Sequence, residues 1–285
     1  MTPLDRLRAR AERVGSPLCL GLDPHPGRLP DGLHADLDGV ESFTRGVLEA
    51  AAAEVSAVKI NVAFFEAFGS AGWAALERLR RDVPEDLYLI LDAKRGDIGS
   101  TAERYAAGLL GHLEADAVTL SPYLGEDAIE PFLAYPDRCV YVLARTSNPS
   151  AASVQELGAG TDPLYLAVAR WVAATWTDGR VGLVVGATAS AELARVREAV
   201  PGPGFLVPGV GAQGGDLTAA VQACNGAWAP GVVSVSRGIA EASGGGDWQR
   251  AAATAASELR ARMREAVLHS GTSAAAAAPS GGSRE

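Results

Sequence analysis

The sequence predicts a single-domain (β/α)₈ barrel, and three observations support this fold class. Short apolar runs of strand length recur along the chain with helical patterns between them, which is the alternation of parallel β-α units. The runs extend over roughly 220 residues, close to the ~250 residues typical of such barrels. The first run continues into GLDPHPGRLP, 21–30, which is not the G-x-G-x-x-G turn expected of a doubly wound dinucleotide-binding sheet.

The apolar runs are expected to form the barrel strands in chain order. They contain few polar residues before their last positions, as expected for parallel strands that are buried on both faces. The segments between them, such as 41–54, 71–82 and 190–200, place apolar residues three or four positions apart and predict helices. The eight expected strands cover 17–23, 55–61, 87–94, 117–121, 139–145, 181–187, 204–210 and 231–236.

Composition and charge restrict the class of partner. The chain is 48% hydrophobic and 21% charged, which indicates a globular domain with a large core. A net charge of −9 argues against a broad nucleic-acid surface but allows a local basic pocket for a small anion. We expect the domain to span residues 1–270 and to be followed by a low-complexity, disordered tail, GTSAAAAAPSGGSRE, at 271–285.

The remaining bulk features predict a soluble protein of the cytoplasm. Three scattered cysteines do not form a disulfide framework. No apolar run approaches the ~20 residues needed to cross a bilayer, and the N-terminal segment lacks the apolar core of a signal peptide. The four histidines form no metal-ligand spacing with the cysteines, so no metal and no cofactor are expected.

Polar side chains end almost every expected strand. In a (β/α)₈ barrel the C-terminal strand ends form the active-site rim. Any one of these residues could be an ordinary solvated or paired strand-end group, but the set as a whole predicts one site. Its members are Asp23, Lys59, Asn61, Asp92, Lys94, Ser121, Arg145, Gln213 and Arg237.

The strongest local signal is the segment DAKRGD at 92–97. Asp92 and Lys94 are two residues apart and therefore project from the same face of a strand. Asp97 follows on the loop, and Thr101 lies one helical turn further on. A lysine flanked by carboxylates stays protonated, which suits a proton donor or a cation that stabilises developing negative charge. The alternative is a structural ion-pair cluster, which also perturbs pKa values.

Two glycine-rich loops follow the last two expected strands, at 207–216 and 234–240. Loops at these places in a barrel commonly bind phosphate through backbone N–H groups, and Arg237 could add a forked, charge-assisted contact. We therefore expect a phosphate site that includes Gly211, Gly238 and Arg237.

With these residues in place, the sequence resembles the orotidine 5′-phosphate decarboxylase family. The D-x-K-x-x-D pattern of that family appears at 92–97, with Lys59 upstream. The longer stretches VKINVAFFE (58–66), DAKRGDIGSTA (92–102), SPYLG (121–125), TSNP (146–149) and VPGVGAQGGD (207–216) are similar to the bacterial subgroup called type 2. The likeness extends from about residue 16 to residue 268.

This resemblance implies a role for each residue at the site. Lys59, Asp92, Lys94 and Asp97 would form the catalytic charge network, with Lys94 stabilising and then protonating a carbanion at C6. The product would be uridine 5′-phosphate, in the de novo synthesis of pyrimidine nucleotides. The implied substrate-binding residues are Asp23 and Lys59 for the ribose, Ser121 for the pyrimidine, Gln213 for pyrimidine and phosphate, and Arg237 with Gly211 and Gly238 for the phosphate. Asn61 is expected to bind the substrate as well.

The resemblance also implies a homodimer in which Asp97 and Thr101 reach the neighbouring active site. One departure concerns the loop after the seventh strand, GAQGGDLTAA, which lacks the aromatic residue that some members place against the phosphate. Two alternatives stay open from the residues. One is a sugar-phosphate decarboxylase or epimerase on the same barrel, and the other is a non-catalytic nucleotide-binding protein.

Overall fold

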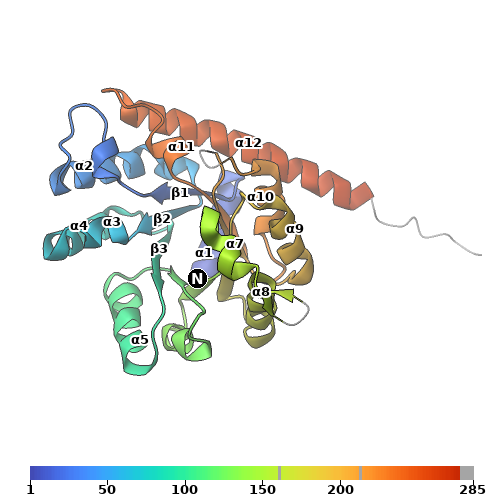
Figure 1. The fold of residues 1–285 in the computed structure, drawn as a ribbon. Helices are drawn as coiled ribbons and strands as arrows, with labels where there is room; N and C mark the ends of the chain where they lie inside the picture. The colour runs from blue at the N-terminus through green and yellow to red at the C-terminus, as the bar shows by residue number, and fades with distance from the viewer. Residues whose placement is uncertain (160–161, 212–213, 277–285) are drawn as a thin grey trace, which may run out of the picture.

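The computed structural model describes residues 1–159, 162–211 and 214–276. Its main sheet is a closed barrel of parallel strands in the order β1-β10-β9-β8-β5-β4-β3-β2 (Figure 1). The predicted fold class is therefore confirmed, and each expected apolar run forms one barrel strand. The strands are β1 Leu18–Leu22, β2 Ala57–Asn61, β3 Tyr88–Arg95, β4 Ala117–Leu120, β5 Cys139–Arg145, β8 Val181–Val185, β9 Phe205–Pro208 and β10 Val232–Val235.

Helices cover the outside of the barrel (Figure 1). The three helices named from sequence are present as α2, α4 and α9, and α2 begins earlier than expected because the Asp36 side chain caps it, accepting from the N–H of Gly39 at 3.0 Å. The helices are α1 Pro3–Val14, α2 Leu37–Ala51, α3 Ala63–Glu66, α4 Gly69–Asp82, α5 Gly99–Ala106, α6 Glu130–Leu133, α7 Ala152–Gln155, α8 Leu164–Thr175, α9 Ser190–Ala199, α10 Leu217–Cys224, α11 Arg237–Ala240 and α12 Trp248–Ala276.

The connection from β5 to α8 carries an excursion that the hydrophobic pattern did not predict. It contains the single-turn helix α7 and an antiparallel pair of two-residue strands, β6 Gly158–Ala159 and β7 Asp162–Pro163. Elements this short are below the length at which a 3.6-residue or two-residue period can be detected.

Side chains fill the N-terminal half of the barrel interior. Tyr88, Ile90, Cys139 and Tyr141 are among the inward-facing residues, and Leu7 of α1 packs against them with no exposed surface. Because side chains alternate along a strand, the next inward positions lie two residues further on, at the open C-terminal end. The packed lower half thus leaves only the upper end of the barrel for a site.

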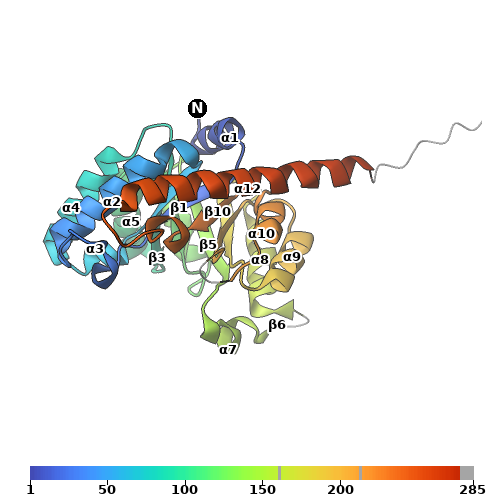
Figure 2. The same cartoon turned by 90° about the horizontal axis from the view of Figure 1, so that it is seen from above.

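The last helix, α12, crosses the outside of the barrel against α2 and α10 and then projects beyond it (Figure 2). The domain boundary expected at residue 270 falls inside this helix, which continues to Ala276. The rest of the expected tail, 277–285, lies outside the described residues. Within the described ranges, no helix combines the length and the apolar character required to span a membrane.

Candidate active site

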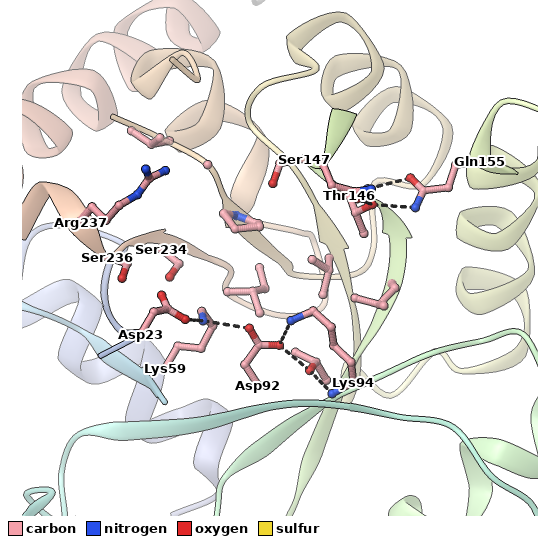
Figure 3. A pocket seen from close by; sticks show the side chains of 18 residues that line it. Asp23, Lys59, Asp92, Lys94, Thr146, Ser147, Gln155, Ser234, Ser236 and Arg237 are labelled. Carbon is pink, nitrogen blue, oxygen red and sulfur yellow. Dashed lines mark hydrogen bonds and ion pairs between the residues drawn. The ribbon is translucent and has the colours of Figure 1, made fainter. Parts of the chain in front are cut away.

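A cavity of about 490 Å³ opens at the C-terminal ends of the strands (Figure 3). Several of its side chains stand two residues beyond the packed interior layer: Lys59 follows Ala57, Asp92 follows Ile90, and Ser234 follows Val232. The alternation of the strands therefore carries the packed core directly into the polar site. The lining comprises Asp23, Lys59, Asp92, Lys94, Thr119, Leu143, Thr146, Ser147, Asn148, Gln155, Val184, Leu206, Pro208, Gly209, Val210, Ser234, Ser236 and Arg237.

Two lysines and two carboxylates form a continuous chain on the cavity wall. Lys59 Nζ lies 3.7 Å from Asp23 Oδ1 and 3.0 Å from Asp92 Oδ2. The other Asp92 oxygen, Oδ1, accepts a hydrogen bond from Lys94 Nζ at 2.6 Å. Both oxygens of Asp92 are thus held by cations, and the four charges sum to zero before any ligand binds.

Burial and charge act in opposite directions on these groups. Burial alone would raise the pKa of Asp92, but the charges of Lys59 and Lys94 outweigh it and hold the pKa well below its usual range. Burial alone would lower the pKa of Lys59, but Asp92 and Asp23 outweigh it and raise that pKa. Burial alone would also raise the pKa of Asp23, but the charge of Lys59 and hydrogen bonds from Ser236 and Asn61 outweigh it and lower that pKa. Asp23, Lys59 and Asp92 are therefore ionised at neutral pH.

Lys94 has an unusual backbone conformation. Its φ is +45°, in the left-handed region that residues with a β-carbon seldom adopt, and the register between β3 and β4 shifts at this point. Thr119 supports the bend, because its Oγ1 accepts from the N–H of Lys94 at 3.0 Å and donates to Asp92 Oδ1 at 2.8 Å. The half-exposed ammonium group of Lys94 is therefore directed into the cavity beside Asp92.

The opposite side of the cavity is suited to an anion. Arg237 begins α11 and lines the cavity, and within the described residues no ion-pair partner is found for its guanidinium. Figure 3 shows it facing the cavity from the end of β10, near Ser234 and Ser236. Gly209, at φ +98°, brings the loop after β9 to the same side. Gln213, predicted to act here, lies outside the described residues.

Several predicted residues are not brought to the cavity lining in this chain. Asn61 hydrogen-bonds to the Asp23 carboxylate and accepts from the N–H of Ala63 at 3.3 Å, so it supports the site from behind. Arg145, to which no substrate contact had been assigned, also lies outside the lining, as do Ser121, Gly211 and Gly238. Their assigned substrate contacts remain predictions without support from this cavity.

Asp97 and Thr101 also lie away from the cavity lining. Asp97 is half-buried, and its carboxylate accepts from the N–H of Ile98 at 2.9 Å, while Thr101 is exposed on α5. Arg95 lies outside the cavity lining and pairs with Glu66. Among the residues that the structure describes, no hydrogen bond or ion pair joins Asp97 to Lys94.

The lining includes polar residues that had not been assigned a role. Thr119 could have been found by counting two residues on from the buried Ala117. The signal for Thr146, Ser147 and Asn148 was the motif TSNP, which had been noted without a function. Gln155, Ser234 and Ser236 complete this group.

The site pairs two lysines with two carboxylates across a cavity from an arginine. Such an arrangement is suited to binding an anion and to stabilising negative charge that develops during a reaction. Because this arrangement lies at the C-terminal mouth of the barrel, the fold and site define a (β/α)₈-barrel enzyme that acts on an anionic small molecule.

Comparison with known proteins makes this class specific. The family model described as orotidine 5′-phosphate decarboxylase / HUMPS matches residues 16–253, and the chain belongs to that family.

The relatives it resembles are similar over nearly their whole length. A protein of Roseiflexus castenholzii named orotidine 5′-phosphate decarboxylase is 51% identical over 272 residues, covering 94% of this chain and 99% of the relative. A relative of the same name from Roseiflexus sp. (strain RS-1) is 48% identical over 271 residues, with the same coverage of 94% and 99%. The solved structure of Leishmania donovani OMP decarboxylase superposes with a TM-score of 0.79 at 42% identity, covering 93% of this chain and 100% of that chain.

Proposed function

We propose that this chain catalyses the decarboxylation of orotidine 5′-phosphate to uridine 5′-phosphate and CO₂, a step of pyrimidine nucleotide synthesis. The observation that carries the proposal is the Lys59–Asp92–Lys94 array at the mouth of the barrel, in a member of the orotidine 5′-phosphate decarboxylase / HUMPS family. Relatives that cover 94% of this chain bear the decarboxylase name.

The array is suited to the difficult step of this reaction. Loss of CO₂ leaves an electron pair at C6 in the plane of the ring, where it cannot delocalise into the π system, so stabilisation near the upper end of the ~8–23 kcal/mol range of enzymes is required. Lys94 would place an ammonium group beside this charge and then donate a proton to C6. Asp92, held between two cations, would lie beside the departing carboxylate.

The other end of the cavity would hold the nucleotide. Arg237 would bind the phosphate, since no protein carboxylate is found paired with it in the described part of the chain. Binding energy from the phosphate, remote from C6, would help to order the reacting groups. Asp23 and Lys59, on neighbouring strands, would hold the ribose hydroxyls.

The cavity favours a different base contact from the one expected from sequence. Ser121 lies outside the lining, whereas Thr146 and Ser147 line the side opposite the lysine–carboxylate chain. The pyrimidine would therefore meet the segment after β5, and we assign its hydrogen bonds to Ser147 in place of Ser121.

We further propose the homodimer in which Asp97 and Thr101 complete the neighbouring site. Asp97 has no ion pair with Lys94 in its own chain, so a trans role does not compete with an existing contact. Exposed apolar side chains surround this region, as expected for a surface that is covered in an assembly. They are Ile98, Tyr105, Tyr123 and Leu124.

We also propose a cytoplasmic location, which the three free, buried cysteines support.

The loss of orotidine 5′-phosphate absorbance, followed with and without a chelator, tests this function. We expect turnover that the chelator leaves unchanged and that Lys94→Ala removes, while Lys94→Ala still binds uridine 5′-phosphate. Turnover abolished by the chelator would favour the sugar-phosphate alternative, and tight uridine 5′-phosphate binding without turnover by the wild type would favour a non-catalytic binding protein. Retained turnover in Lys94→Ala would overturn its role as proton donor.

A further inference from the structure

A partly buried hydrogen-bond framework lies behind the segment 146–148, outside the lysine–carboxylate array. We propose that Gln155 and Arg145 are positioning residues that fix Ser147 for recognition of the substrate base, an inference that rests on the proposed function. Neither residue contributes to the charge network at Lys94.

Both polar atoms of the Gln155 side-chain amide, the oxygen and the nitrogen, form hydrogen bonds with Thr146 (Figure 3). Its Oε1 accepts from the N–H of Thr146 at 2.9 Å, and its Nε2 donates to Thr146 Oγ1 at 2.7 Å. Because Thr146 Oγ1 receives this bond, its own proton goes to Asn148 Oδ1, 2.6 Å away. The residues on both sides of Ser147 are thereby fixed in position and in hydrogen-bond polarity.

Arg145 contacts both Thr146 and Gln155 and so supports the hydrogen bonds between them. Its side chain is buried, and Nη1 donates to the carbonyl of Thr146 at 3.2 Å and lies 3.5 Å from Gln155 Oε1. Its Nη2 pairs with Glu156 at 2.8 Å and with Glu192 of α9 at 3.6 Å. Two donors thus converge on Gln155 Oε1, which sets the orientation of the amide, and Arg145 connects the segment to the helical layer.

Gly186, directly after β8, supports Ser147 from the other side. A β-carbon on Gly186 would lie 3.1 Å from both the N and the Cβ of Ser147, so the glycine permits a close approach of the two loops. Within the described residues, no hydrogen bond engages the hydroxyl or the N–H of Ser147, although the residue lines the cavity. Gln155 and Arg145 thus hydrogen-bond to Thr146 and not to Ser147. The hydroxyl and N–H of Ser147 are therefore free to bind the polar edge of a base.

Binding of two probes by titration calorimetry tests the proposal. Uridine 5′-phosphate carries the base, whereas ribose 5-phosphate has only the sugar and phosphate. We expect Gln155→Leu to weaken uridine 5′-phosphate about 10-fold, as for loss of one well-placed hydrogen bond, and to leave ribose 5-phosphate unchanged. Gln155→Glu should fall between, because its carboxylate can still accept from the N–H of Thr146 but cannot donate to the hydroxyl.

Further variants separate positioning from a general structural role. Gly186→Ala displaces Ser147 without touching Gln155 and should give the same selective loss. In the double variant Ser147→Ala/Gln155→Leu, uridine 5′-phosphate should bind no more weakly than in Ser147→Ala alone, because Gln155 acts through Ser147. Arg170→Met, which removes an exposed arginine of α8 that pairs with Asp162 of β7, is the matched control for Arg145→Met and should change neither affinity.

Parallel weakening of ribose 5-phosphate in Gln155→Leu, or losses that multiply in the double variant, would overturn the proposal. Arg145→Met removes a buried cation and can fail to fold, so the Gln155 and Gly186 variants decide the outcome. Wild-type protein that neither binds uridine 5′-phosphate nor consumes orotidine 5′-phosphate would overturn the proposed function, and this inference with it. Normal wild-type activity with unaffected variants would overturn only the positioning roles.

Discussion

Lys59 stays charged although it is almost fully buried, because Asp92 and Asp23 face its ammonium group. Asp92→Asn removes the nearer partner and leaves only the more distant one. Breaking a buried pair from one side costs about 3–5 kcal/mol, and we expect the lower end of this range since Asp23 remains. Urea unfolding at pH 7 measures the loss, and the exposed Asp31→Asn should change stability by less than about 0.5 kcal/mol.

The stability that Asp92 contributes should depend on pH in a defined direction. Its folded-state pKa is depressed, so the unfolded state binds the proton more readily. The contribution is fully present above the unfolded-state pKa of about 3.9 and is lost as the pH falls below it. The difference in unfolding free energy between wild type and Asp92→Asn should therefore be constant from pH 7 to about 5 and shrink below about pH 4. A difference that grows on acidification would contradict this assignment.

The backbone at Lys94 offers a second test at the residue scale. A left-handed φ costs a residue with a β-carbon about 1–2 kcal/mol, whereas glycine adopts it freely. Lys94→Gly and Lys94→Ala both remove the ammonium group, so their difference isolates the backbone. We expect the glycine variant to be more stable by about 1 kcal/mol in urea unfolding, with both inactive. Equal stability, or a more stable alanine variant, would show that the bend is not strained.

At the scale of elements, Arg197 of α9 is a partly buried arginine that lies outside the cavity lining and joins several elements. Its guanidinium lies 3.5 Å from the ring centre of Phe205, and burial lowers its pKa to about 10. It donates to four backbone carbonyls that join α9, α10 and the entry to β9, those of Val200, Pro203, Ala223 and Cys224.

Arg197→Met should therefore lower the free energy of unfolding by about 3 kcal/mol, because several buried carbonyls lose their donor. Turnover well below the melting temperature should be unchanged, since Arg197 is not part of the cavity lining. Arg195→Met is the matched control on the same helix. Its side chain is half-exposed and 3.9 Å from Asp162, so its loss should cost less than about 0.5 kcal/mol.

The barrel strands could be predicted because burial on both faces leaves a continuous apolar run that ends where the chain meets the rim, as at Leu91 and Asp92. The same reasoning located Lys59 and Lys94. It also assigned Ser121 to the site, but Ser121 lies outside the cavity lining, since the register shift between β3 and β4 interrupts simple alternation near the rim. The role of Gln155 could not be predicted from the sequence, because a four-residue helix carries no periodic signal. Its hydrogen bond to Thr146 depends on the tertiary fold of the segment.

At the scale of the whole molecule, two parts of the segment 92–101 separate. Asp92 and Lys94 face the cavity of their own chain, whereas Asp97 and Thr101 lie outside its lining, and Ile98, which follows Asp97, is exposed. An opposite arrangement, with all four groups in one site, would have placed Asp97 near Lys94. The single chain thus holds the Asp92–Lys94 pair in its own cavity. Its Asp97 and Thr101 lie on a surface that is suited to completing the site of a second chain, as proposed above.

Mixing inactive subunits tests whether this chain forms the proposed dimer and whether Asp97 acts across it. When Lys94→Ala and Asp97→Ala proteins are unfolded together and refolded in equal amounts, half of the dimers are mixed, and one of the two sites in each regains both groups. We expect about a quarter of the wild-type turnover, a fraction that follows from the two-fold symmetry of the dimer. Lys94→Ala mixed with Asp92→Asn is the matched control and should recover nothing, because those side chains meet within one chain at 2.6 Å. Mixed dimers that form, as shown by a size tag on one subunit, but remain inactive would contradict the trans role of Asp97.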